Sequence, residues 1–150
     1  MTGLSRRAFA LGGLLAACTM GIRPAFAARP VFYRSPGCGC CHVWTRRMAE
    51  AGLDVDLRDT DDLAGMSERL GIPSHLAGCH VGQIGSYVIS GHVPPDDILR
   101  LLVEMPKAKG LLVPGMPAGS PGMETDGPAD SYQVLLLHED SSTEVFASYG

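Results

Sequence analysis

The segment "PVFYRSPGCGCCHVWTRRMAEAG", residues 30–52, decides the fold, because it joins a strand, a cysteine-rich turn and a helix. Residues 30–35 are typical of a short β-strand, and the Pro-Gly pair that follows ends it in a turn. Residues 41–52 favour an amphipathic helix, since Trp44 and Met48 lie four positions apart on one face. The sequence therefore predicts that the cysteines lie where a strand passes into a helix.

The rest of the chain continues this alternation of strands and helices. We predict a strand over 53–59, a helix over 61–71, strands near 76–81 and 87–90, a helix over 94–105, a Pro/Gly-rich loop over 107–130 and a closing hairpin. The order β-α-β-α-β-β-α is that of a thioredoxin-like α/β fold. We expect a mixed sheet flanked by helices, with the Pro/Gly-rich loop and a C-terminal β-hairpin added. The segment Gly71-Ile72-Pro73 lies where such folds carry a proline beside the cysteines.

Residues 1–27 are typical of a signal peptide. A basic start with Arg6 and Arg7 precedes a short apolar run that closes in an Ala-x-Ala pattern, and the arginine pair resembles a twin-arginine export signal. The apolar run is too short for a membrane span. We predict cleavage after Ala27 and a periplasmic domain over residues 28–150. Lipid modification at Cys18 is the alternative.

The predicted mature chain is acidic. Three of the 12 Lys and Arg residues lie before residue 28, so nine remain against 16 Asp and Glu, a formal charge of −7. Such a surface repels nucleic acid and anionic lipid, so neither is an expected partner.

Four cysteines lie beyond residue 27: Cys38, Cys40, Cys41 and Cys79. An even number in an exported chain commonly indicates disulfides. The spacing argues against a simple cross-link, because adjacent cysteines rarely pair and a staple stabilises most when it closes a long loop. A thiol at a helix N-terminus, by contrast, loses its proton more readily, and the thiolate is both a nucleophile and a metal ligand.

A redox couple and a metal site are both compatible with this pattern. Cys38 and Cys41 have the C-x-x-C spacing of a thiol–disulfide oxidoreductase, but Cys40 is superfluous for that chemistry. Crowded thiolates select Cu(I), Zn(II) or iron–sulfur clusters, and adjacent cysteines can each bridge between neighbouring ions. Copper is the more typical hazard outside the cytoplasm. Cys79 is expected to complete the set.

Four further residues are second-tier candidates: His42, His80, Met116 and Met123. His42 follows the cysteines at the helix start, and the methionines offer thioethers, which Cu(I) accepts, in a loop able to fold over the site. His80 adjoins Cys79 on an expected strand, so the two side chains should point to opposite faces, and we assign His80 a structural or supporting role. His92 is expected to tie a turn together by hydrogen bonds.

Three segments carry a resemblance to a known family: "YRSPGCGCCHVW", "GIPSHLAGCHVGQIGSYVISGHVP" and "LLVPGMPAGSPGME". They resemble the small periplasmic metal-binding domain family that includes the copper-resistance protein CopG. The combination of C-G-C-C-H with a distant C-H and G-H-V-P is specific to it. The resemblance implies a thioredoxin-like fold and a cysteine-bridged multi-copper cluster at Cys38, Cys40, Cys41 and Cys79. It also implies interconversion of Cu(I) and Cu(II) in copper resistance.

We therefore expect a periplasmic protein that binds several Cu(I) ions per chain. Its expected partners are copper ions and other periplasmic copper-handling or electron-transfer proteins. Activity as a copper oxidoreductase is compatible with this expectation. The alternatives are a thiol–disulfide oxidoreductase using Cys38 and Cys41, and a zinc or structural module.

Overall fold

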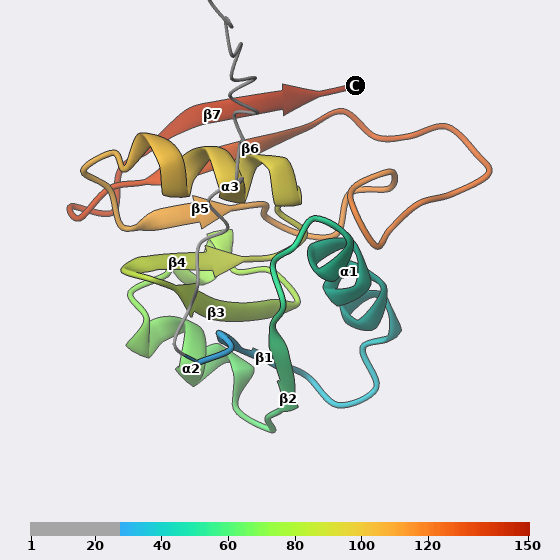
Figure 1. The fold of residues 1–150 in the computed structure, drawn as a ribbon, viewed down its shortest axis with the longest axis horizontal. Coiled ribbons are helices and arrows are strands. Elements are labelled where there is room, and N and C mark those ends of the chain that lie inside the picture. The colour runs from blue at the N-terminus through green and yellow to red at the C-terminus, as the bar shows by residue number, and fades with distance from the viewer. Residues whose placement is uncertain (1–27) are drawn as a thin grey trace, which may run out of the picture.

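The computed structural model describes residues 28–150, so the predicted signal peptide and both predicted processing sites lie outside the described residues. The elements are β1 (Val31–Arg34), α1 (Gly39–Glu50), β2 (Asp56–Asp59), α2 (Leu63–Arg69), the 3-10 helix η1 (Ser74–Leu76), β3 (His80–Ile84), β4 (Tyr87–Ser90), α3 (Pro95–Glu104), β5 (Gly110–Leu112), β6 (Tyr132–Leu137) and β7 (Thr143–Tyr149) (Figure 1). Over this range, no helix combines the length and the hydrophobicity that crossing a membrane requires.

Between residues 28 and 150 the strands form one mixed sheet of seven, in the order β2-β1-β3-β4-β5-β6-β7. β1 is parallel to β2, and β4 is parallel to β5. All other neighbours are antiparallel, including the β6–β7 hairpin at the C-terminus. The predicted α/β class, with a mixed sheet and a closing hairpin, is confirmed.

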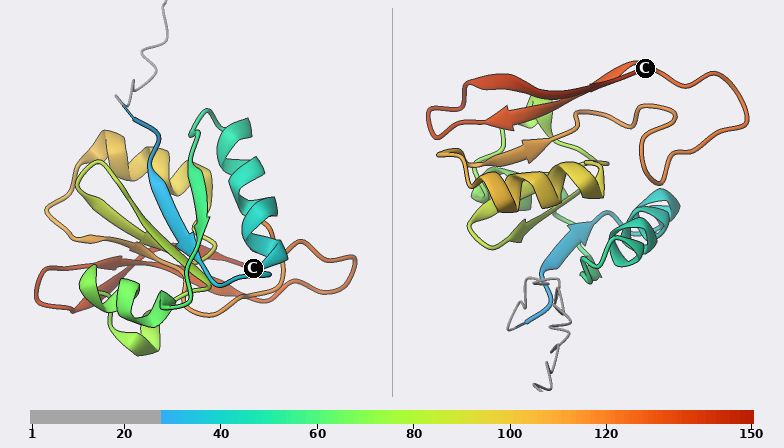
Figure 2. Two further views of the ribbon diagram at one scale, coloured as in Figure 1. Left: turned by 90° about the horizontal axis from the view of Figure 1, so that it is seen from below. Right: turned by 45° about the horizontal axis from the view of Figure 1, so that its top comes forward.

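Helices cover both faces of the sheet, and the strand residues alternate between two cores (Figure 2). The larger core includes Trp44 and Met48 of α1 and Ile98 of α3, all fully buried. The smaller core lies on the face covered by α2. In β4, Ile89 belongs to the larger core and Val88 to the smaller one. This alternation fixes which side of the sheet the start of α1 occupies.

Several boundaries differ from the sequence prediction. The strand expected over 76–81 begins only at His80, because η1 precedes it and Cys79 lies in the bend between them. Pro73, expected beside the cysteines, is the N-cap residue of η1, and residues 28–150 contain no cis peptide bond. β5 was expected to be loop. Its pairing with β4 depends on Gly110, where a Cβ would collide with the Val88 carbonyl.

The segment between β5 and β6, residues 113–131, is the predicted Pro/Gly-rich loop. It projects beyond the sheet and returns past the start of α1 (Figures 1 and 2). Its own hydrogen bonds hold it in shape: the Asp130 N–H donates to the Ala118 carbonyl, and the Ala118 N–H donates to the Asp130 carboxylate, each at 2.9 Å. The loop is therefore positioned to cover the cysteine turn.

Candidate metal centre

The cysteine turn begins α1. Cys38 is the N-cap residue, with an extended backbone and no side-chain capping bond, and Cys40 and Cys41 lie in the first helical turn. That turn contains no acidic residue, so its free N–H groups and the helix dipole are not neutralised by carboxylates. Sulfur atoms placed here therefore lie where negative charge is stabilised.

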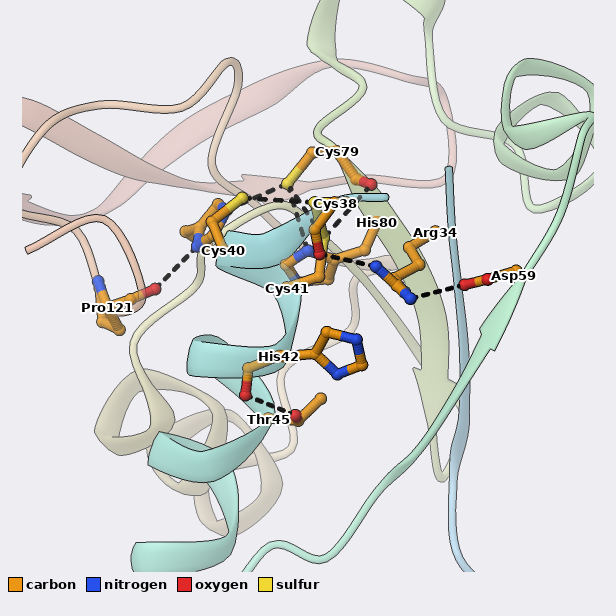
Figure 3. The surroundings of a disulfide bond; sticks show 11 residues. Arg34, Cys38, Cys40, Cys41, His42, Thr45, Asp59, Cys79, His80 and Pro121 are labelled. Carbon is orange, nitrogen blue, oxygen red and sulfur yellow. Dashed lines mark hydrogen bonds and ion pairs between the residues drawn. A yellow bond between two sulfur atoms is a disulfide. The ribbon is translucent and has the colours of Figure 1, made fainter. Parts of the chain in front are cut away.

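Four sulfur atoms converge at this turn (Figure 3). Cys38 and Cys41 form a disulfide, whereas Cys40 and Cys79 are free thiols. Cys40 Sγ lies 3.3 Å from Cys38 Sγ, and Cys79 Sγ lies 3.7 Å from Cys41 Sγ. Each free thiol is thus next to one sulfur of the disulfide.

The disulfide joins cysteines that the sequence did not predict to pair. The adjacent residues Cys40 and Cys41 are not bonded to each other, but Cys38 and Cys41 are, although their bond closes only a short loop. Cys38 and Cys41 are separated by one helical turn, which sets their Cα atoms 5.7 Å apart, a separation that suits a disulfide. The prediction against a disulfide is therefore wrong for Cys38 and Cys41, whereas the assignment of the four cysteines as metal ligands stays a prediction.

Cys79 reaches the turn because two backbone segments touch. Its neighbour Gly78 lies against Gly91 so closely that a Cβ on Gly78 would collide with the Gly91 backbone. The Gly78 N–H also donates to Ser90 Oγ at 3.0 Å, and Gly78 forms an isolated bridge with Gly115. These contacts bring the bend before β3 beside the turn that follows β4.

Two buried histidines flank Cys79. His92 Nε2 lies 3.0 Å from Cys79 Sγ, and His80 Nδ1 lies 3.4 Å from it. The expectation that His80 and Cys79 point to opposite faces is wrong, because Cys79 precedes the strand and strand alternation does not apply to it. Cys79, His80 and His92 form a second group whose donor atoms lie within 4.8 Å of one another.

Hydrogen bonding decides which nitrogen of His92 is available. Its Nδ1 lies 2.7 Å from the Pro121 carbonyl, which can only accept, so Nδ1 carries the proton. The unprotonated Nε2 therefore faces Cys79. Histidine ligands in metal sites are oriented in the same way, by a bond from the other ring nitrogen to a carbonyl or carboxylate.

Burial keeps this group uncharged. It lowers the pKa of His80 to about 3, with a smaller effect from the adjacent His92, and it lowers the pKa of His92. It raises the pKa of Cys79 to about 12, with a further contribution from negative charge on Cys40. At neutral pH the group is two neutral imidazoles and a thiol, and a metal ion must displace the thiol proton.

The loop over residues 113–131 closes this side of the site. A Cβ on Gly122 would lie 2.8 Å from the carbonyl oxygen of Cys40 and 2.8 Å from the backbone nitrogen of Trp44, and Gly122 has a φ of +92°. Glu124 forms an ion pair of 2.9 Å with Arg47 of α1. Met123 lies between these two contacts in the sequence and is half-buried, whereas Met116 is 55% exposed. Met123 therefore lies between two loop residues that contact α1, whereas Met116 is largely exposed.

His42 is exposed and points away from the sulfur atoms (Figure 3). Its carbonyl accepts a bond from Thr45 Oγ1 at 2.9 Å, which is local to the helix. The structure thus brings His80 to the cysteines and leaves His42 outside.

Arg34 and Trp44 hold two parts of the site in place by direct contacts. The nearly buried Arg34 donates from Nη1 to the Cys38 carbonyl at 2.7 Å and pairs with Asp59 at 2.8 Å. Trp44 packs against the His80 ring, with centroids 4.2 Å apart, and its Nε1 donates to the Val93 carbonyl at 2.9 Å. Together they fix the backbone of Cys38 and the ring of His80.

His92 is a potential metal ligand that was not among the candidates predicted from the sequence. The available signal was a repeated pattern, since Gly78 precedes Cys79 and Gly91 precedes His92. A glycine on each side lets two bends approach closely and present the next side chain to a shared space.

Comparison with solved structures identifies relatives of this chain. Two structures, described as "Copper resistance protein copG- Form 1" and "Form 2", match it with TM-scores of 0.76 and 38% sequence identity. The matches cover 80% and 81% of this chain, and 95% and 97% of those chains. The chain belongs to the CopG family.

A family described as "Protein of unknown function, DUF411" matches residues 76–123 of this CopG-family chain. This segment contains Cys79, both buried histidines and the two loop methionines, whereas the cysteine turn of α1 lies before it. A comparison with curated proteins gives no significant match.

Proposed function

We propose that this protein binds copper in the periplasm and holds Cu(I) with Cys38, Cys40, Cys41 and Cys79. The observation that carries the proposal is the convergence of these four sulfur atoms, with two neutral imidazoles beside Cys79. Thiolate and imidazole are donors that suit copper. Membership of the family of a copper resistance protein supports copper over zinc.

We also propose that each chain holds more than one copper ion. Cys40 and Cys41 are adjacent in the first turn of α1, and their sulfur atoms lie within 4.8 Å of each other and of those of Cys38 and Cys79. Adjacent cysteines oriented in this way suit bridging between two ions better than chelation of one. Interconversion of Cu(I) and Cu(II) at this site, within copper resistance, is part of the same proposal. Met123 and Met116 are proposed as auxiliary thioether ligands.

The fold and location are proposed on related grounds. The element order β-α-β-α-β-β-α and the sheet order β2-β1-β3-β4 support a thioredoxin-like fold extended by β5, β6 and β7. We propose that residues 1–27 are a twin-arginine signal peptide and that residues 28–150 are the exported domain. Its partners are then other periplasmic copper-handling or electron-transfer proteins.

The test is a titration of the reduced chain with Cu(I) against a chromophoric Cu(I) chelator. We expect several copper equivalents per chain, accompanied by sulfur-to-copper charge-transfer absorption. Cys40→Ser and His92→Gln should each weaken the competition for copper. His75→Gln is the matched control, because His75 is exposed in η1 and lies outside both donor groups. Unchanged copper binding by Cys40→Ser would contradict the proposal.

The disulfide between Cys38 and Cys41 favours one second candidate, a thiol–disulfide oxidoreductase. If that is the function, Cys40→Ser keeps full disulfide-exchange activity and copper has no effect on it. Uptake of one tightly held zinc ion without a response to copper would instead indicate a zinc or structural module.

A further inference from the structure

The donors of this site divide into two groups that respond differently to oxidation. When Cys38 and Cys41 form a disulfide, as they do in this structure, neither sulfur atom is available as a thiolate ligand. Cys79, His80 and His92 remain a complete group with the disulfide closed, and Cys40 also stays free. The chain can therefore lose two electrons at one group and keep soft donors at the other.

The two groups touch. Cys79 Sγ is 3.7 Å from Cys41 Sγ, and Cys40 Sγ is 3.3 Å from Cys38 Sγ. An ion that binds Cys79 or Cys40 is therefore a near neighbour of a sulfur atom of the Cys38–Cys41 pair. An electron that passes between the two groups therefore crosses only a van der Waals contact between two sulfur atoms.

We propose that the reduced chain reduces Cu(II) with the electrons of its own Cys38–Cys41 dithiol. Two Cu(II) ions each accept one electron and become Cu(I). The two thiols lose these two electrons and two protons, the S–S bond forms, and the protons pass to water. The proposal rests on the proposed copper function and adds the source of the electrons. It is a single-turnover reaction that needs no other reductant.

The group that remains suits the product. Cu(I) prefers thiolate and imidazole, which Cys40, Cys79 and His92 still provide after the disulfide closes. The unprotonated His92 Nε2 is held towards Cys79 by the bond from Nδ1 to the Pro121 carbonyl, which does not involve the disulfide. His80 adds a further imidazole nitrogen to this group, because its Nδ1 lies 3.4 Å from Cys79 Sγ. Oxidation of the dithiol thus leaves Cu(I) held.

The test uses the full chain with Cys18→Ser, so that only the four site cysteines contribute thiols. The chain is reduced, freed of metal and of reductant, and mixed anaerobically with Cu(II). Loss of the Cu(II) paramagnetic signal counts the electrons transferred. Alkylation, tryptic digestion and mass spectrometry then locate the disulfide, because cleavage after Arg34 and Arg46 places Cys38, Cys40 and Cys41 in one peptide and Cys79 in another.

We expect about two Cu(II) ions to be reduced per chain, as for a two-electron couple, with a disulfide between Cys38 and Cys41. Cys40 and Cys79 should remain alkylatable once copper is removed. Cys38→Ser, at a half-exposed position, should abolish this stoichiometry and the disulfide while its circular dichroism spectrum stays native. His75→Gln is the matched control, because His75 is exposed and lies outside both donor groups, and it should still reduce about two Cu(II) ions.

Persistence of the Cu(II) signal, or pairing of Cys40 with Cys79, would overturn the inference. Its failure is distinguishable from failure of the proposed function. A reduced chain that binds added Cu(I) but leaves Cu(II) unreduced keeps the copper-binding function and loses this inference. A chain that forms the Cys38–Cys41 disulfide with Cu(II) but releases all Cu(I) keeps this inference and loses the copper-holding function.

Discussion

Replacement of Arg34 by methionine tests how the cysteine turn is held in place. Arg34 is about 10% exposed in its side chain, donates to the Cys38 carbonyl and pairs with Asp59, whose side chain is 53% exposed. A hydrogen bond from a charged group contributes about 1.5–3 kcal/mol, and a pair with such an exposed carboxylate contributes at most about 1 kcal/mol. Arg34 Nε is buried without a partner, so its removal returns about 1 kcal/mol. We expect Arg34→Met to lower the free energy of unfolding by about 0.5–3 kcal/mol.

The assay is urea unfolding followed by circular dichroism, with the disulfide intact in both proteins. Asp59→Asn is the control, because it removes the ion pair and leaves the bond to Cys38, and it should cost at most about 1 kcal/mol. If Arg34→Met changes the unfolding free energy by less than Asp59→Asn does, the bond to the Cys38 carbonyl does not stabilise the turn. Equal losses in the two variants would refute the reasoning in the same way.

Three further predictions concern the parts that surround the cysteines. Gly122→Ala should destabilise the fold by about 1–3 kcal/mol in thermal unfolding, because its φ is +92° and its Cβ would meet the Cys40 carbonyl; Gly127→Ala, whose Cβ would make only an ordinary contact of 3.6 Å with Thr125 Oγ1, should stay within about 0.5 kcal/mol. Trp44→Phe should lower the unfolding free energy by about 2–4 kcal/mol, since the Val93 carbonyl loses its donor and the core loses volume; circular dichroism is the readout, because Trp44 is the single tryptophan. Burial raises the pKa of Cys79 from 9.0 to about 12, so its contribution to stability is present below pH 9 and is lost as the pH rises towards 12. The difference in unfolding free energy between wild type and Cys79→Ala should therefore shrink over that range, and a constant difference would contradict it.

The strand, turn and helix around the cysteines could be predicted because their signals are local. Trp44 and Met48 mark the buried face of α1 by their spacing, and both are fully buried. β5 could not be predicted in this way, since three residues carry no periodicity and Gly110 becomes a strand residue only through its pairing with Val88. Helix and hairpin signals were sufficient for the fold class, and long-range pairing decided the rest.

The candidate site was predictable to a similar extent. Cys38, Cys40 and Cys41 are close in sequence, so their convergence follows from the turn. The side chain of His80 was misplaced because the sequence does not show that β3 begins one residue after Cys79. His92 meets Cys79 only through the contact between Gly78 and Gly91, which joins segments 13 residues apart; the glycine before each residue marks a bend, but the sequence does not show that the two bends touch.

The metal ligands come from segments that are far apart in the sequence, so a bound ion would hold these segments together. An ion shared by Cys41 and Cys79 would clasp segments 38 residues apart, and one shared by Cys79 and His92 would clasp segments 13 residues apart. A bound ion of this kind acts as a reversible cross-link, because it favours the folded chain over every conformation in which the segments separate. A full load would make the molecule more resistant to heat and to proteases, and release of the load would loosen it again.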